Sequence, residues 1–262
     1  MSEYPRKFDT RISTPSGQIH VYGNMASETP GPCVLFSHGF ATNGFESHRM
    51  FLDVSTEFVK KGFSTILFDH IGCGYSDGNF RDFLLSDAIK NIGIIFEWMC
   101  GQPFCREGEI FLLGQSLGTA TAIEALAADS GLAGFILWNL SADFARRYPR
   151  LFGPAMSHGK SVCIEDKGLF THPDFIADAK RFAVIDRFAE VRCPVLFLNS
   201  GSDEKADLGL ARAAAERMVA PFEMRMIQGA NHSFKGQPEL EAAAIQHSIN
   251  WAKKILSCDR VG

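Results

Sequence analysis

One short segment combines a serine with the turn residues that could make it reactive. The segment 114–118 reads G-Q-S-L-G; it follows the apolar run I-F-L-L and precedes the alanine-rich run T-A-T-A-I-E-A-L-A-A. A serine at a sharp turn between a strand and a helix projects above the sheet at the positive end of the helix. Glycines on either side let the strand and the helix approach closely. The pattern therefore predicts that Ser116 is a nucleophile.

A serine hydroxyl needs a base that removes its proton, and His232 is the histidine best placed to do so. It lies in Q-G-A-N-H-S-F, between the last expected strand and the last expected helix, so its loop reaches the sheet edge expected to hold Ser116. Asp203 follows the run P-V-L-F-L-N and is the carboxylate expected to orient the imidazole. Glu204 and Asp207 are alternative acids.

The turn S-H-G-F-A-T-N at 37–43 is expected to complete the site. A tetrahedral intermediate needs hydrogen-bond donors for its oxyanion, and the backbone N–H of Leu117 is one candidate. The backbone N–H of Phe40, which follows a His-Gly pair, is the other. His38 is expected to support this turn rather than take part in the chemistry, and it is also a candidate for substrate contact.

These residues must be positioned by a sheet and its helices. Two early strands are expected at 8–13 and 18–25, as a hairpin. Continuous apolar runs are typical of strands buried on both faces of a parallel sheet, and they occur at 33–37, 64–68, 109–113, 134–139, 194–199 and 223–227. Helical patterns alternate with them at 47–61, 82–100, 116–128, 205–219 and 238–257. The alternation predicts an α/β fold with an open, mostly parallel sheet.

Residues 141–190 interrupt this alternation. The segment mixes arginine, proline, glycine and aromatic residues, and only its second half, 174–187, has a helical pattern. We expect a small cap inserted into a core formed by 1–140 and 191–262. Three of its aromatic residues are expected to contact substrate together with Gln115: Phe144, Phe152 and Phe170.

Composition excludes several other classes of function. The chain has 262 residues, a net charge of −4 and a pI near 6.1, which gives no basic surface for nucleic acid or an anionic membrane. Its seven cysteines include no C-x-x-C pair and are expected to be buried free thiols. No signal peptide or membrane span is apparent, so a cytoplasmic location is expected. The expected partner is a small-molecule ester, with neither nucleic acid nor membrane, and a homodimer is left open.

Several segments, taken in order, resemble the α/β-hydrolase superfamily. They are S-H-G-F at 37–40, F-D-H-I-G-C-G-Y-S-D-G at 68–78, G-Q-S-L-G at 114–118, G-S-D at 201–203 and G-A-N-H-S-F at 229–234. The order nucleophile, acid, base is also that of the superfamily. The resemblance implies the α/β-hydrolase fold, with a mostly parallel eight-stranded sheet. Within the superfamily the chain is most similar to cinnamoyl and feruloyl esterases and related bacterial acyl esterases.

This resemblance implies hydrolysis of a carboxylic ester with an aromatic or other apolar acyl group, without a metal or cofactor. The same residues would also suit a thioesterase, or a hydrolase of amide or C–C bonds, because fold and triad do not select the bond. A non-catalytic ligand-binding protein of the same fold is the alternative from another class. A metal-dependent enzyme is weakly indicated, since no motif such as H-E-x-x-H is present.

Overall fold

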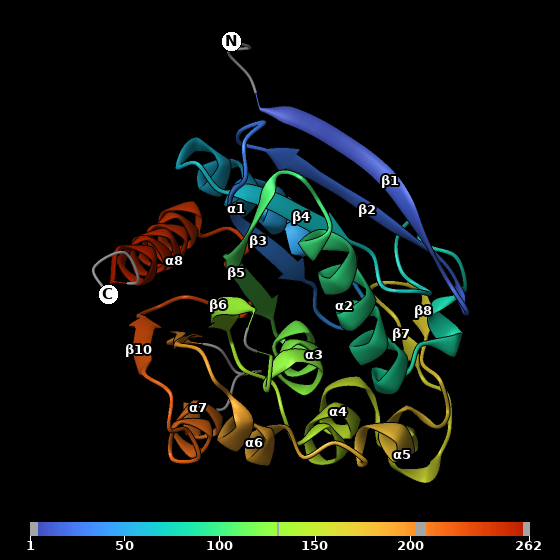
Figure 1. Cartoon of the computed structure of the whole chain (residues 1–262). Helices are drawn as coiled ribbons and strands as arrows, with labels where there is room; N and C mark the ends of the chain where they lie inside the picture. The colour runs from blue at the N-terminus through green and yellow to red at the C-terminus, as the bar shows by residue number, and fades with distance from the viewer. Residues whose placement is uncertain (1–4, 130, 203–207, 259–262) are drawn as a thin grey trace.

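An eight-stranded sheet lies between two layers of helices (Figure 1). The computed structural model describes residues 5–129, 131–202 and 208–258. None of the helices in these ranges combines the length and the apolar character needed to cross a lipid bilayer. The strands, in their order across the sheet, are β1 (Arg6–Thr14), β2 (Gly17–Met25), β4 (Ser64–Phe68), β3 (Gly31–Ser37), β5 (Cys105–Gln115), β6 (Leu132–Trp138), β9 (Val195–Ser200) and β10 (Phe222–Ile227).

The sheet is parallel from β4 to β10 and antiparallel at its other edge. β1 and β2 form the expected hairpin, in which Thr14 pairs with Gly17, and β2 runs antiparallel to β4. Every other pair of neighbouring strands is parallel. The carboxyl ends of the parallel strands therefore meet at one edge, where an open α/β sheet binds its ligands. The predicted fold class is confirmed.

Both faces of the sheet are covered, which explains the continuous apolar runs. In β3, Leu35 belongs to the core on one face and Phe36 to the core on the other. In β5, Leu112 likewise belongs to the same core as Leu35, and Leu113 to the same core as Phe36. One core includes residues of α2 (Leu85–Cys100), α3 (Leu117–Leu126) and α7 (Leu208–Ala215). The other includes residues of α1 (Met50–Lys60) and α8 (Pro238–Cys258).

Two predicted helices begin later than expected because their first residues have left-handed backbone angles. The helix expected at 47–61 is a 3-10 turn, Ser47–Arg49, followed by α1, since His48 and Arg49 have φ of 44° and 69°. Ser116 has φ of 53°, so α3 begins only at Leu117. Of the helix expected at 205–219, residues 205–207 lie outside the described ranges.

The segment between β6 and β9 is more regular than expected. It contains α4 (Phe144–Phe152), the short hairpin of β7 (Cys163–Ile164) and β8 (Leu169–Phe170), then α5 (Phe175–Ala179) and α6 (Val184–Arg187). Figure 1 shows α6, α4 and α5 in a row along the lower part of the view, with α6 next to α3 and α5 next to α2. The helical pattern at 174–187 corresponds to α5 and α6, whereas the sequence analysis missed α4. The boundaries of core and cap stay a prediction.

The seven cysteines all lie in the described ranges and carry free thiols. Three of them are buried: Cys33, Cys73 and Cys193. Three others are exposed to solvent: Cys100, Cys163 and Cys258. The cysteines are therefore free thiols, as expected, but fewer than half of them are buried.

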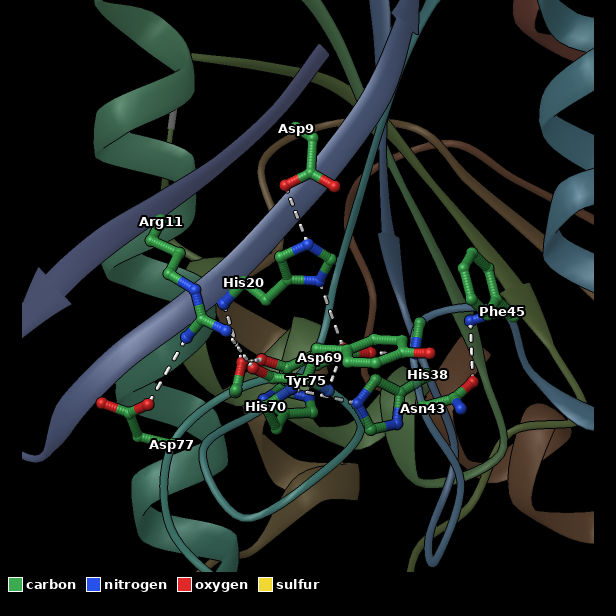
Figure 2. A network of polar contacts seen from close by, with 12 residues as sticks. Asp9, Arg11, His20, His38, Asn43, Phe45, Asp69, His70, Tyr75 and Asp77 are labelled. Carbon is green, nitrogen blue, oxygen red and sulfur yellow. Dashed lines mark hydrogen bonds and ion pairs between the residues drawn. The ribbon is translucent and has the colours of Figure 1, made fainter. Parts of the chain in front are cut away.

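A buried carboxylate ties together two loops at the carboxyl edge of the sheet. Asp69 follows β4 and is 1% exposed. Its Oδ1 accepts a hydrogen bond of 2.7 Å from the N–H of Gly44, and its Oδ2 accepts one of 2.7 Å from the N–H of Tyr75. Figure 2 shows Asp69 at the centre of this network, with His20 beside it. The loop after β3 and the loop after β4 are thus fixed to the same side chain.

Two buried histidines lie beneath the same loops. Nδ1 of His38 donates to the carbonyl of Gly39 at 2.9 Å, and its Nε2 accepts from the N–H of His70 at 3.1 Å (Figure 2). The ring of His70 is fully buried, and neither of its nitrogens has a hydrogen-bond partner in the described part of the chain. Burial, and then the neighbouring His38, lower the pKa of His70 well below its usual value of 6.5.

Replacing Gly118 with alanine should destabilise the fold by about 1–3 kcal/mol, because the new Cβ would overlap the carbonyl oxygen of Ser37 at the end of β3. Gly93 is the matched control: it also lies within a helix, α2, but nothing lies within 4 Å of its Cβ position. Gly93→Ala should stabilise the protein by about 0.5–1 kcal/mol. Urea unfolding followed by tryptophan fluorescence measures both changes, and an unchanged midpoint for Gly118→Ala would contradict the prediction.

The stability of the wild-type protein should fall as the pH drops below 6.5. Below that value a histidine takes up a proton in the unfolded chain but not at the buried site of His70, so protons favour unfolding. The free energy of unfolding should lose up to about 1.4 kcal/mol per pH unit for this histidine. His70→Leu should make the loss shallower between pH 6.5 and 5, whereas His247→Leu, at an exposed position of α8, should leave it unchanged. Urea unfolding at several pH values tests this, and equal slopes in all three proteins would count against it.

Candidate active site

A pocket of about 580 Å³ opens at the carboxyl edge of the sheet. Its walls come from the turn after β3, the turn between β5 and α3, the loop after β10, and the segment between β6 and β9. Residues of each contribute to the lining: Phe40, Glu46, Gln115, Ser116, Arg147, Tyr148, Phe152, Lys167 and His232. The pocket therefore brings together Ser116 and His232, which are far apart in the sequence.

Ser116 occupies the sharp turn that the sequence predicts. Its φ and ψ are 53° and −119°, angles that a residue with a side chain adopts only under constraint from its surroundings. The constraint is visible: its N–H donates to the carbonyl of Trp138 at 3.0 Å. A Cβ on Gly114 would lie 2.6 Å from the carbonyl oxygen of Gly118, so the strand and the helix touch through backbone alone. The hydroxyl does not cap α3 and lies in the pocket lining.

The backbone of His232 is held by the ends of neighbouring strands. Its carbonyl oxygen accepts a hydrogen bond of 2.7 Å from Nε2 of Gln115 and one of 2.9 Å from Nδ2 of Asn139. Asn139 follows β6, and its Oδ1 accepts from the N–H of Ser200, at the end of β9, at 2.7 Å. The loop that carries His232 is therefore fixed against β5, β6 and β9. Asp203, like its alternatives, lies outside the described residues.

The alternative acids, Glu204 and Asp207, also lie outside the described residues. The identity of the carboxylate that orients His232 therefore stays a prediction. What the structure does describe is the turn leading to it. The N–H of Ser202 donates to the carbonyl of Ala230 at 2.9 Å, and the N–H of Gly201 donates to the carbonyl of Ile227 at 2.9 Å. The chain leaving β9 thus runs beside the loop that carries His232.

The turn after β3 is held by a carboxylate that the sequence analysis did not single out. Glu46 is buried and accepts hydrogen bonds from the N–H of Gly39 and, at 2.8 Å, from the N–H of Ser47. A Cβ on Gly39 would lie 3.6 Å from the Cβ of Ser116, so the turn passes directly beside the serine. Phe40 is the next residue.

Leu117, the other candidate donor, is the first residue of α3. The first N–H groups of a helix have no partner within the helix, so they are free to bind an anion. The roles of the Phe40 and Leu117 N–H groups in an oxyanion hole stay predictions.

Aromatic rings form one wall of the pocket. The ring of Phe40 lies 4.9 Å from that of Tyr148 and 5.2 Å from that of Phe152. It also contacts Phe175 of α5, at 4.9 Å. Burial raises the pKa of the Tyr148 hydroxyl above its usual range, so this ring is uncharged at neutral pH. This wall of the pocket therefore presents uncharged aromatic surface.

The predicted substrate contacts divide into two groups. Gln115 and Phe152 line the pocket. His38, Phe144 and Phe170 are not part of its lining. His38 is fully buried beneath the turn, Phe144 is 3% exposed and packs on Tyr148, and Phe170 is half-exposed on β8. The structure thus places His38 in the supporting role expected for it.

Sequence reasoning missed helix α4, which supplies three lining residues that were not expected: Arg147, Tyr148 and Leu151. Phe144, Tyr148 and Phe152 recur at intervals of four, which places them on one face, with ring centroids 5.1 Å and 5.2 Å apart. This spacing was the signal for a helix. Arg147 and Leu151, also four apart, line the pocket beside them. Glu46 had no signal, because its role depends on the folded turn.

Comparisons with known proteins agree with this geometry. The model of the family described as serine aminopeptidase, S33, matches residues 28–163. Alpha/beta hydrolase domain-containing protein 17B of Homo sapiens is 26% identical over 200 residues, which is 76% of this chain and 60% of that protein. Alpha/beta hydrolase domain-containing protein aho-3 of Caenorhabditis elegans is 25% identical over 228 residues, 87% of this chain and 59% of that protein. The chain thus spans about three fifths of the length of these relatives.

Solved structures of similar fold cover nearly the whole chain. Est1E from Butyrivibrio proteoclasticus, with ferulic acid bound, superposes with a TM-score of 0.78 at 20% identity, covering 92% of this chain and 98% of its own. The α/β hydrolase GrgF from Penicillium sp. sh18 superposes with a TM-score of 0.75 at 17% identity, covering 96% of this chain and 99% of its own. At these identities the likeness concerns the fold. With the family match across more than half of its length, the chain belongs to the serine aminopeptidase S33 family of the α/β-hydrolase superfamily.

Proposed function

We propose that this hydrolase cleaves a carboxylic ester through a serine nucleophile. One observation carries the proposal: Ser116 sits in constrained backbone angles at the head of α3, and it lines the same pocket as His232. A hydrolase needs such a serine to be exposed to substrate and close to a base. Our proposal has three elements: that the bond cleaved is an ester, that Ser116, His232 and Asp203 form a triad, and that the N–H groups of Phe40 and Leu117 form an oxyanion hole.

The reaction would proceed in two halves. His232 takes the proton of the Ser116 hydroxyl as Oγ attacks the acyl carbonyl, and the N–H groups of Phe40 and Leu117 stabilise the oxyanion. The imidazolium, oriented by Asp203, then protonates the leaving alcohol. Water attacks the acyl-enzyme in the same way and releases the acid.

The aromatic wall supports an apolar or aromatic acyl group. Phe40, Tyr148, Leu151 and Phe152 line the pocket together with Ser116. Aromatic rings in such contact favour another ring by about 0.5–1.5 kcal/mol beyond the area that is buried. Est1E, which shares the fold, holds ferulic acid in its solved structure. We therefore propose an acyl group of that chemical class, taken up by residues 141–190 acting as a cap.

Ser116→Ala and His232→Ala should each lower kcat for 4-nitrophenyl and cinnamoyl esters by at least about 10³-fold, because one removes the nucleophile and the other its base. A fluorophosphonate probe should label the wild type and Ser257→Ala, a control at the exposed end of α8, but not Ser116→Ala. A parallel panel of thioester and aminoacyl anilide substrates identifies the bond. A wild type that the probe does not label would instead support a non-catalytic binding protein.

Phe152→Ala should raise KM for a cinnamoyl ester by about tenfold relative to the KM for an acetyl ester of the same alcohol, since it removes one ring from the aromatic wall. Phe170→Ala is the control, because that ring is half-exposed on β8 and does not line the pocket. Steady-state kinetics on both esters measures the ratio. Equal effects of the two substitutions would mean that the wall does not contact the acyl group.

A further inference from the structure

Arg147 places a positive charge in the wall of the pocket. It lies on α4 and lines the pocket that also contains Ser116 and His232. Its Nη1 is buried and has no hydrogen-bond partner among the residues that the structure describes. A guanidinium stays charged at all ordinary pH values, and a buried donor without an acceptor is costly. The folded protein thus keeps a charged donor incompletely satisfied beside its candidate nucleophile.

Within the described part of the chain, the acidic groups around the pocket do not neutralise this arginine. Among the described residues no carboxylate forms an ion pair with Arg147, whereas its neighbour Arg146 pairs with Asp143 at 2.6 Å. The Glu46 carboxylate is occupied by the N–H groups of Gly39 and Ser47. Glu165 also lines the pocket but is exposed to solvent on the β7–β8 turn.

The second cation of the pocket is already engaged. Nζ of Lys167 donates to the carbonyl of Ala41 at 2.7 Å, which joins the β7–β8 hairpin to the turn after β3. Arg147 is therefore the group best able to receive an anion. The exposed acids Glu165 and Asp166, which also line the pocket, would repel a doubly charged phosphate more strongly than a carboxylate.

We propose that Arg147 recognises a carboxylate on the substrate, remote from the bond that is cleaved. The inference rests on the proposed function and narrows its substrate class to esters that carry one free carboxylate on a hydrocarbon frame. Leu151 lies one turn after Arg147 on the same side of α4, so the apolar frame and the carboxylate would contact adjacent positions of one helix. A carboxylate matches the planar fork of the guanidinium with two parallel hydrogen bonds.

Two pairs of aryl esters, each with one charged and one neutral member, test the proposal. Mono-4-nitrophenyl adipate carries the carboxylate on the acyl side, and 4-nitrophenyl hexanoate is its neutral counterpart of equal chain length. The pair 3-carboxyphenyl hexanoate and phenyl hexanoate places the carboxylate on the alcohol side. For at least one pair, wild type should prefer the charged ester in kcat/KM, and Arg147→Met should reduce that preference by about tenfold to a hundredfold. The pair that responds shows on which side the carboxylate lies.

Arg150→Met is the matched control, because it removes the same charge from an exposed position of α4 outside the pocket lining. It should leave both preferences at the wild-type value. Arg147→Lys keeps the charge but cannot donate two parallel hydrogen bonds to a carboxylate. Its preference for the charged ester should lie between those of wild type and Arg147→Met. If Arg147→Met fails to fold by circular dichroism, the lysine variant decides, together with the loss of the wild-type preference at high salt.

The outcomes separate this inference from the proposed function. Hydrolysis of the neutral esters without any preference for the charged ones, or an equal loss of preference in Arg147→Met and Arg150→Met, overturns the role of Arg147 and leaves the esterase intact. A wild type that cleaves none of the four esters and does not react with the fluorophosphonate probe overturns the esterase itself.

Discussion

The backbone contact between the start of α3 and the end of β3 is the constraint on which the rest of the site depends. Gly118 lies against the carbonyl of Ser37 so closely that a Cβ would overlap it, and Gly114 meets Gly118 in the same way. This contact leaves no room for a gradual turn between β5 and α3. Ser116 therefore takes a φ of 53°, and its hydroxyl reaches the pocket instead of capping the helix. The cost of the strained angles is offset by the packing of α3, which is mostly buried, and of the buried second half of β5, residues 110–115.

The same edge of the sheet also fixes the residues that come from distant parts of the chain. The order β5, β6, β9 puts the ends of three parallel strands side by side, and each contributes one hydrogen-bonding group: Gln115, Asn139 and Ser200. Two of these groups hold the carbonyl of His232, so the imidazole lies on a loop whose backbone position is set by the sheet. On the other side of the pocket, Glu46 and Asp69 perform a similar task for the turn after β3. The geometry of the candidate site is thus set by the ends of the strands.

The sequence predicted the features that depend on local pattern. Buried parallel strands are continuous apolar runs, so β3, β4 and β5 could be located, and G-Q-S-L-G between a strand and a helix located Ser116. Features that depend on folded contacts could not be predicted. Glu46 has no motif, because only the closed turn brings its carboxylate to the N–H of Gly39. Helix α4 was missed because Pro149 and several arginines obscure the repeat of Phe144, Tyr148 and Phe152. Phe170 was expected to contact substrate because of its residue type, whereas it is half-exposed on β8 and is not part of the pocket lining.

The pocket is built from two parts of the chain, the ends of the sheet strands and the segment between β6 and β9, and these two parts differ in how freely their side chains can change. Ser116 and His232 are held by strand ends of the buried sheet, where a side chain cannot vary without disturbing backbone contacts. The facing wall comes from α4 and the β7–β8 hairpin, which contact the core mainly through rings such as Phe40 and through the bond from Lys167 to Ala41. Substitutions at Arg147, Leu151 or Phe152 therefore alter charge and shape where a ligand would lie without moving the turn that carries Ser116. A fold organised in this way can keep one chemistry while substitutions in a single short helix change which ligands fit the pocket.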